Sequence, residues 1–260
     1  MSLTTGNAPL AATPGDSNYS IESPAHRLFM LPVTRRIRAE LDGRTVLDTR
    51  EARLLYETGI RARLYVPVAD FLKDALVASD ETTYCPFKGT ATYRSVRAGD
   101  RTSEDAIWVY DEPNPETPWL KGYAGVYEER FDRWLDEDDE VVGSLPDPFH
   151  RVDVRHTSRH IRVSGADGVV LADSTAALLV SETSTTDRFY LPRADVKVDL
   201  APSDRTWTCP YKGHATYYSV PGAEDVAWSY ESPLAEAAPL AGYISFAGDG
   251  IEVAEVSSGR

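Results

Sequence analysis

Two pentapeptides, Cys85–Gly89 and Cys209–Gly213, contain the only cysteines of the 260-residue chain, and both read Cys-Pro-aromatic-Lys-Gly. A cysteine reacts as its thiolate, and a lysine three residues later could lower the thiol pKa across a turn. Cys85 and Cys209 are therefore candidate nucleophiles or redox thiols. The alternative is a structural turn, in which Cys is a small buried residue, Pro fixes φ and Gly supplies a conformation that other residues resist.

The surroundings of the two cysteines favour the structural turn. No partner base is common to both copies, because His214 follows the second pentapeptide while Thr90 stands in its place after the first. A turn explains Cys, Pro and Gly, but it does not require a cation. The candidate functional residue of the pentapeptide is therefore its lysine.

Four cations recur at matched places in the two halves of the chain. In an acidic protein they could hold the carboxylate or phosphate of a small ligand; they are Arg38, Lys88, Arg162 and Lys212. The alternative for these cations is an internal salt bridge, for which the sequence suggests Asp70, Asp195, Glu116 or Glu236.

Aromatic residues also recur at matched places, in a Trp-x-Tyr-x-x-Pro motif and in the strand that follows each pentapeptide. Alternation along a strand places the Trp and Tyr of this motif on one face. Such a wall could receive a flat or cationic ligand, and the alternative is core packing. The predicted ligand-binding aromatics are Tyr93, Trp108, Tyr110, Tyr217, Trp228 and Tyr230.

These motifs belong to a duplication that covers most of the chain. The segment from Arg35 aligns with the segment from Arg159, and an offset of about 124 superposes the pentapeptides. A period this long, present twice, indicates tandem domains. We expect a tail and lead-in over 1–34, a first domain over 35–135, an acidic and Pro-containing linker over 136–156, and a second domain over 157–256.

Each repeat is predicted to be mainly β. Residues 37–41 alternate in polarity and are followed by Asp42-Gly43, which is typical of a hairpin. Further strands are expected over 52–59, 61–67, 90–96, 106–110 and 122–129, with one short helix over Val68–Val77. The fold class is therefore two tandem domains of antiparallel sheets, with about seven strands and a short helix in each.

Composition limits the partners. The formal charge of −14 would repel phosphate backbones, so we expect no nucleic acid. The N-terminal residues lack the basic start and apolar run of a signal peptide, and no apolar stretch is long enough to span a bilayer. We therefore expect a cytoplasmic protein with free thiols and no membrane partner.

The residue types also predict no cofactor. A structural zinc needs about four ligands, yet the first repeat holds one Cys and no His. The glycine-rich phosphate loops and the G-x-S-x-G motif are absent. We expect neither a bound metal nor a bound nucleotide cofactor.

The ordered motifs, Y-x-P-x-A-D, C-P-[FY]-K-G-x-A-T-Y, W-x-Y-x-x-P and a closing G-Y strand, resemble domain of unknown function family 427, here in tandem. The resemblance covers about 100 residues in each half and implies a fold of the Mss4-like or β-tent type. Relatives of that fold include zinc-binding modules and B-type methionine sulfoxide reductases, but fold kinship does not transmit activity. A nucleotidyltransferase label attached to the family would require paired carboxylates holding Mg²⁺, which the sequence does not show.

Three functions remain open. The leading hypothesis is binding of a small anionic or polar molecule through the pentapeptide turn and the aromatic wall. The second is an enzyme that uses Cys85 or Cys209. The third is a structural or interaction protein whose two repeats pack on each other within the chain.

Overall fold

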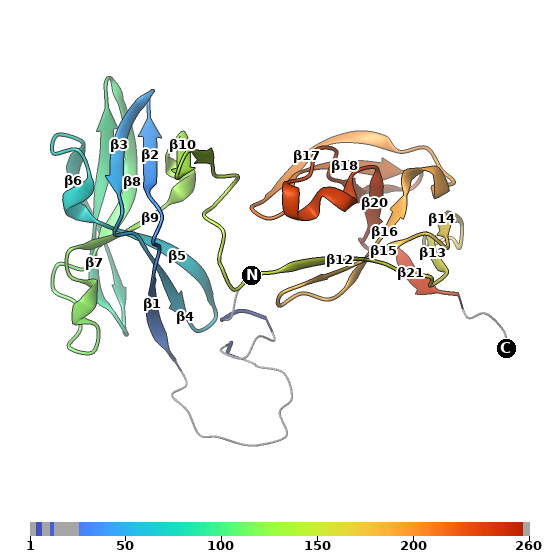
Figure 1. Cartoon of the computed structure of the whole chain (residues 1–260), viewed down its shortest axis with the longest axis horizontal. Coiled ribbons are helices and arrows are strands. Elements are labelled where there is room, and N and C mark those ends of the chain that lie inside the picture. The colour runs from blue at the N-terminus through green and yellow to red at the C-terminus, as the bar shows by residue number, and fades with distance from the viewer. Residues whose placement is uncertain (1–3, 7–10, 13–25, 257–260) are drawn as a thin grey trace, which may run out of the picture. The chain divides into compact units, whose positions relative to one another are not determined.

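The computed structural model describes residues 4–6, 11–12 and 26–256 of the chain. The chain divides into two compact units, Met1–Asp147 (unit 1) and Pro148–Arg260 (unit 2) (Figure 1). The division lies inside the stretch 136–156 that we expected to be a linker. Most of the expected tail lies outside the described residues. Within the described part, no helix is long and apolar enough to cross a membrane.

Unit 1 is built from two antiparallel sheets. The larger one has the order β1-β4-β5-β9-β8-β7-β6, with the bounds β1 Leu28–Pro32, β4 Arg53–Glu57, β5 Ile60–Pro67, β9 Tyr123–Val126, β8 Arg101–Val109, β7 Gly89–Ala98 and β6 Leu76–Cys85. The smaller one has the order β11-β10-β2-β3, with the bounds β11 Asp139–Glu140, β10 Arg133–Asp136, β2 Ile37–Leu41 and β3 Arg44–Thr49.

Unit 2 repeats this plan. Its larger sheet has the order β12-β15-β16-β20-β19-β18-β17, with the bounds β12 Val152–His156, β15 Leu178–Glu182, β16 Arg188–Pro192, β20 Tyr243–Phe246, β19 Ala223–Ser229, β18 Gly213–Val220 and β17 Ala201–Cys209. Its smaller sheet is β14-β13-β21, with β14 Val170–Ser174, β13 Ile161–Ser164 and β21 Glu252–Glu255. The predicted mainly β fold with antiparallel sheets is confirmed.

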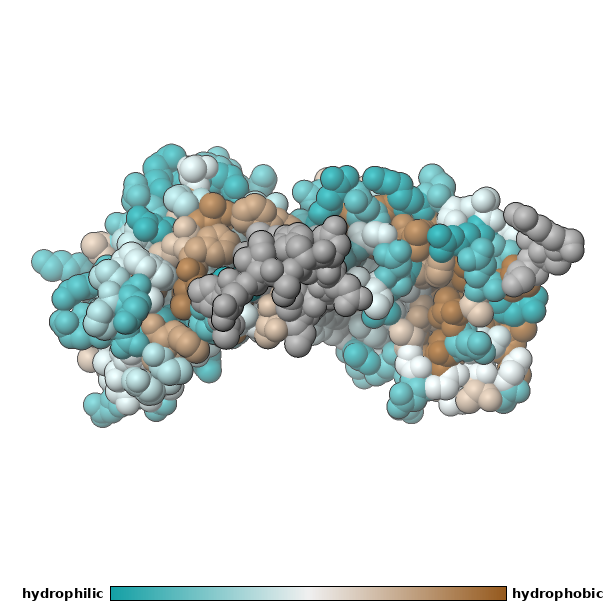
Figure 2. Space-filling model, turned by 90° about the horizontal axis from the view of Figure 1, so that it is seen from below, coloured by the Kyte–Doolittle hydropathy of each residue, from teal (hydrophilic) through white to brown (hydrophobic). Residues whose placement is uncertain are grey.

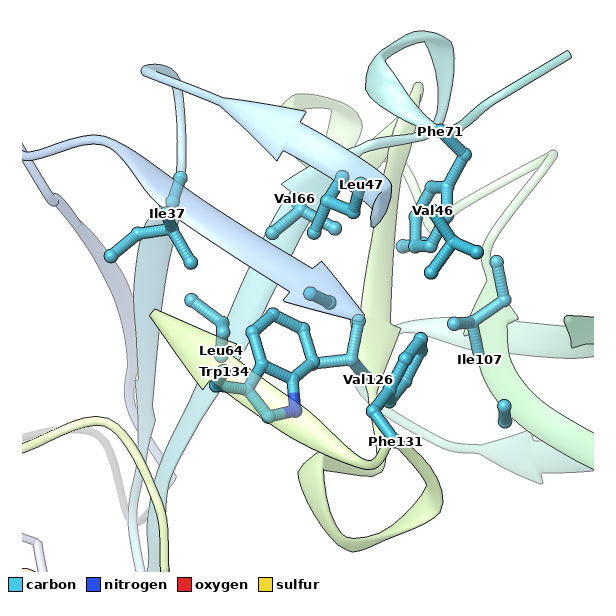
Figure 3. Close-up of a cluster of buried hydrophobic side chains, with 14 of the residues drawn as sticks. Ile37, Val46, Leu47, Leu64, Val66, Phe71, Ile107, Val126, Phe131 and Trp134 are labelled. Carbon is cyan, nitrogen blue, oxygen red and sulfur yellow. The ribbon is translucent and has the colours of Figure 1, made fainter. Parts of the chain in front are cut away.

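The two faces of the larger sheet pack against different sets of residues. In unit 1, Leu64 and Val66 of β5 point into the main apolar core, together with residues of β2, β3 and β10 from the smaller sheet (Figure 3). Tyr65, between them in the sequence, belongs to a second cluster with Tyr110. Because successive side chains of a strand alternate in direction, the aromatic residues gather on the face that is turned away from the main core.

The hairpin at Asp42-Gly43 is confirmed, since both residues have positive φ, 51° and 68°. The helix predicted over Val68–Val77 is much shorter than expected and consists of one 3-10 turn, η1 Val68–Asp70. The reason is that the following residues pair with β3: Phe71 forms a bridge with Leu47, and the backbone N–H of Leu72 donates to the carbonyl of Val46 at 2.9 Å. Phe71 is buried by this pairing and not by a helical stripe.

The strands β6 and β17, which form one edge of each larger sheet, were not predicted from the sequence. Both strands are mostly exposed and carry polar residues, so they lack the alternation that marks a half-buried strand. On the face drawn in Figure 2, hydrophilic residues surround smaller apolar areas in both units. Large exposed apolar side chains include Tyr84, Phe87 and Trp207, all in or next to the pentapeptides.

The end of unit 1 is held by Glu128, in the 3-10 turn η3 Glu128–Arg130. Its carboxyl accepts the backbone N–H of Leu145 at 2.6 Å, and its carbonyl accepts the indole N–H of Trp134 at 2.9 Å. Burial raises the pKa of the Glu128 carboxyl to about 7. The folded state therefore favours the protonated form of this group.

Glu128 should make the stability of unit 1 fall as the pH rises. Its folded pKa of about 7 exceeds the reference value of 4.5, so between these values the folded state binds more protons than the unfolded state. We expect the unfolding free energy to decrease by about 3 kcal/mol from below pH 4.5 to above pH 7. Glu128→Gln keeps an acceptor for Leu145 and should remove this dependence. Urea unfolding at several pH values measures it. Glu129→Gln, at the exposed neighbour, is the control, and parallel pH profiles of wild type and Glu128→Gln would contradict the assignment.

Candidate functional site

Each pentapeptide forms the turn between the edge strand and its neighbour. Cys85 ends β6, Gly89 begins β7, and the backbone N–H of Lys88 donates to the carbonyl of Cys85 at 3.3 Å. Gly89 has a φ of 102° and Gly213 a φ of 100°, a region that disfavours other residues. The backbone N–H of Asn114 donates to the carbonyl of Lys88 at 3.1 Å, which docks the Pro-rich loop on the turn.

The turn directs its lysine inward, to a glutamate on the strand β4 or β15. In unit 1 the ammonium of Lys88 donates to a carboxylate oxygen of Glu57, and the two side chains are only 10% and 7% exposed. In unit 2 Lys212 makes the same bond to Glu182. This corrects the salt-bridge partners suggested by the sequence, none of which pairs with either lysine.

A histidine completes the network in both units. Nε2 of His26 lies 3.0 Å from the second carboxylate oxygen of Glu57, and Nε2 of His150 lies 3.0 Å from that of Glu182. The His26 ring also stacks on Phe87 of the turn, with ring centroids 3.6 Å apart. The glutamate therefore lies between a lysine and a histidine, and the aromatic residue of the pentapeptide covers the histidine.

The residues next to the histidine and the glutamate hold them in register. In unit 1 the backbone N–H of Arg27 donates to the hydroxyl of Thr58 at 3.1 Å, and the N–H of Thr58 donates to the carbonyl of Arg27 at 3.1 Å. Arg151 and Thr183 make the same two bonds in unit 2, at 2.9 and 3.0 Å. A His-Arg pair and a Glu-Thr pair thus recur at matched positions. The His-Arg pairs precede Arg35 and Arg159, where the repeats were predicted to begin, and so they were not among the predicted site residues.

In unit 2 the network keeps its glutamate ionised. Burial alone would raise the pKa of Glu182, but the hydrogen bond from His150 and the charge and hydrogen bond of Lys212 outweigh it and hold the pKa at about 2. A carboxylate with so low a pKa is a weak proton acceptor at neutral pH. The network is therefore better suited to holding fixed charges in place than to accepting a proton as a general base.

Unit 1 has a pocket of about 230 Å³, and the ion pair of Lys88 and Glu57 forms part of its lining. Its aromatic wall has a fixed geometry, because the indole N–H of Trp108 donates to the hydroxyl of Tyr65 at 3.1 Å and the two rings meet at 85°. The lining consists of Leu55, Glu57, Ile60, Arg61, Arg63, Tyr65, Thr83, Lys88, Tyr93, Trp108, Tyr110 and Tyr127. Four predicted ligand-binding residues, Lys88, Tyr93, Trp108 and Tyr110, therefore line one pocket.

The polar groups of this pocket are mainly hydrogen-bond donors. Burial raises the pKa of Tyr110 well above its usual range, and burial together with the hydroxyl of Tyr93 raises the pKa of Tyr127 to about 12. These phenols keep their protons at neutral pH. Within the described part of the chain, Arg61 and Arg63 make no ion pair. Neither arginine was singled out from the sequence; Arg63 corresponds to Arg188 of the second repeat, and Arg61 corresponds to Thr186.

The remaining predicted residues lie elsewhere or have other partners. Arg38, on β2 of the smaller sheet, donates to Asp138 at 2.7 Å, and Arg162, on β13, donates to Asp173 at 2.7 Å. Neither lines the pocket of unit 1. Cys85 packs with the aromatic cluster beside Tyr110 and is partly buried.

Unit 2 has the same wall and a buried thiol. The indole N–H of Trp228 donates to the hydroxyl of Tyr190 at 3.1 Å, as Trp108 does in unit 1. Tyr217 and Tyr230 belong to the same cluster as Cys209, which is 6% exposed. Both cysteines are free.

Fold and site together define a duplicated all-β protein with one lysine–glutamate–histidine network in each unit. The chain belongs to the family described as Domain of unknown function (DUF427), which matches residues 29–137 and again residues 153–257. A comparison with curated proteins gives no match. The family description names no activity, so the function has to be argued from the site.

The ion pair of Lys88 and Glu57 should be necessary for the stability of unit 1. Removing one partner of a buried pair leaves an uncompensated charge, and we expect Lys88→Met to lower the unfolding free energy by about 3–5 kcal/mol. The double variant Glu57→Leu/Lys88→Met should recover most of this loss. Chemical unfolding measures both. Lys121→Met, which breaks the exposed pair with Glu112, should cost less than about 1 kcal/mol, and an equal effect of Lys88→Met and Lys121→Met would contradict the interpretation.

Proposed function

We propose that the protein binds a small molecule with an anionic group in the aromatic pocket of unit 1. The observation that supports this most strongly is the pair of arginines, Arg61 and Arg63, that line the pocket without an ion-pair partner in the described residues. The pocket is smaller than the roughly 300–1,000 Å³ typical of sites for drug-sized molecules. A ligand that fits this pocket is therefore smaller than a drug-sized molecule.

The charges of the lining residues support an anionic group. Glu57 contributes one negative charge, and Lys88, Arg61 and Arg63 contribute three positive charges, so the lining carries two positive charges in excess. Glu57 and Lys88 compensate each other in their ion pair. The two arginines are thus available for a carboxylate or phosphate, to which a guanidinium can donate two parallel hydrogen bonds. The excess is local, because the whole chain carries a charge of −14.

The aromatic wall supports a ligand with a flat or apolar part. Tyr65, Tyr93, Trp108 and Tyr110 supply ring surface, and the phenol hydroxyls supply donors that can reach acceptor atoms of the ligand. A pocket that combines apolar walls with a few converging polar groups is the usual form of a small-molecule site. The wall and the arginines together favour one ligand with both features.

The two other functions draw less support from the contacts. In a thiol enzyme the pentapeptide lysine would activate its cysteine, but Lys88 and Lys212 are engaged with glutamates. A purely structural role accounts for these ion pairs. It does not account for the donors and the unpaired arginines that line the pocket above them.

Binding should depend on Arg61 and Arg63. Phenyl phosphate and benzoate are suitable probes, with benzyl alcohol as the neutral comparison, and the indole N–H signal of Trp108 in a ¹H–¹⁵N spectrum reports occupation of the pocket. We expect both anions to shift this signal and Arg61→Ala or Arg63→Ala to weaken each anion about tenfold, since a charge-assisted hydrogen bond contributes roughly 1.5–3 kcal/mol.

Arg97→Ala is the matched control, because Arg97 is an exposed arginine of unit 1 that does not line the pocket. It should leave both affinities unchanged. The proposal fails if neither anion shifts the Trp108 signal, or if benzyl alcohol binds as tightly as the two anions.

A further inference from the structure

The two units share one wall but differ in what lies over it. The pairs Trp108–Tyr65 and Trp228–Tyr190 have nearly the same geometry, with rings at 85° and 90° and the same 3.1 Å hydrogen bond. The neighbouring tyrosine of the wall is Tyr93 in unit 1 and Tyr217 in unit 2. A difference in what covers these tyrosines therefore reflects the residues around the wall.

In unit 2 the wall carries arginine side chains of the chain itself. The guanidinium carbon of Arg205 lies 4.3 Å from the centroid of the Tyr217 ring, and that of Arg188 lies 5.3 Å from the centroid of Trp228. These distances are typical of cation–π contacts. Neither arginine has an ion-pair partner within the described part of the chain, so the aromatic rings are the partners that the structure shows for them.

Arg205 corresponds to Glu81 of unit 1. Both lie four residues before the cysteine of the pentapeptide. Their backbone N–H groups make the same bond, from Glu81 to the hydroxyl of Ser79 at 3.1 Å and from Arg205 to that of Ser203 at 3.0 Å. The equivalence thus holds in the structure as well as in the sequence, and the charge at this position is reversed between the units.

The arginine over Trp228 has a separate explanation. In unit 1 the ring of Trp108 is covered by Tyr127, with centroids 4.7 Å apart, while Ala247 stands in the place of Tyr127 in unit 2. Arg188 therefore covers a tryptophan that has no counterpart of Tyr127 beside it. Tyr127 also stacks with Tyr93, with ring centroids 6.5 Å apart. No cation lies over the Tyr93 ring among the described residues, and Glu81 stands where unit 2 has the stacking arginine.

We propose that the ligand of unit 1 has a planar cationic group that lies on Tyr93 beside Glu81, and that its anionic group contacts Arg61 and Arg63. This inference rests on the proposed function and names the class of its ligand, a guanidino or amidino acid. Unit 2 holds the corresponding planar cation as part of its own chain, in Arg205, and has Thr186 in place of Arg61. Its wall is thus occupied without a ligand.

The position of Glu81 supports its role beside the wall. Thr83, two residues further along β6, lines the pocket and its hydroxyl lies 3.2 Å from that of Tyr93. Glu81 lies in the irregular stretch of β6 between Ala78 and Thr82, and Arg205 lies in the corresponding stretch of β17 between Pro202 and Thr206. The contact of Arg205 with Tyr217 shows that this position reaches the wall in unit 2. A carboxylate there attracts a cation over Tyr93 and repels an anion, so the two ends of the ligand are bound by opposite charges.

The test compares 4-guanidinobutyrate with butyrate and with 5-aminopentanoate, a cationic acid without a planar group, using the Trp108 indole signal of the full chain. We expect the guanidino acid to bind about tenfold more tightly than butyrate, since a partly desolvated cation–π contact contributes roughly 1–2 kcal/mol. The aminopentanoate should bind with intermediate affinity. Glu81→Arg, which copies the residue of unit 2, should abolish the preference for the guanidino acid without weakening butyrate.

Glu116→Arg is the matched control, because it makes the same charge change at an exposed residue of unit 1 outside the pocket lining. It should preserve the preference. Equal affinities for 4-guanidinobutyrate and butyrate, or a preference that survives Glu81→Arg, would overturn this inference and leave the proposed function standing. If butyrate, 4-guanidinobutyrate and benzoate all leave the Trp108 signal unmoved, the proposed function fails and this inference fails with it.

Discussion

The buried ion pair between the pentapeptide lysine and a glutamate of the larger sheet constrains both units. Removing two charges from water costs several kcal/mol per ion, and their attraction offsets this only if the geometry is good and the remaining lone pairs are satisfied. In unit 1 the histidine satisfies the second carboxylate oxygen of Glu57. The ion pair therefore depends both on the turn that directs Lys88 and on the strand β4 that carries Glu57. This requirement explains why the lysine, and the Pro and Gly that fix the turn, recur in both copies.

Alternation along the strands separates the two faces of the larger sheet. Leu64 and Val66 of β5 bury one face against the smaller sheet, while Tyr65 turns to the other face and accepts the indole N–H of Trp108. The sheet that carries the aromatic wall therefore packs against the core on its opposite face, and the ion pair holds it at one end. A wall supported in this way can hold a ligand with little reorganisation, which limits the entropy lost on binding.

Much of this could be predicted from one sequence, and the failures have a common cause. The hairpin at Asp42-Gly43, the turn at Gly89 and the alternation of Trp108 are local properties, and all were confirmed. Glu57 lies 31 residues before Lys88, and only the pairing of strands brings them together. The helix over Val68–Val77 was predicted from a stripe of apolar residues, but long-range pairing of Phe71 with Leu47 gave those residues a different way to be buried.

The two units differ at positions that the buried ion pair does not constrain. Lys88 and Glu57 cannot be replaced singly without leaving a buried charge, so both units retain them. Exposed positions around the wall carry no such cost, because substitutions there usually alter stability by less than about 0.5 kcal/mol. The chain has changed at such positions, with Glu81 against Arg205 and Arg61 against Thr186. A duplicated scaffold that keeps the ion pair and varies the exposed residues around the wall can thus keep its fold, while one copy holds an arginine of its own over Tyr217 and the other copy has Glu81 at that position.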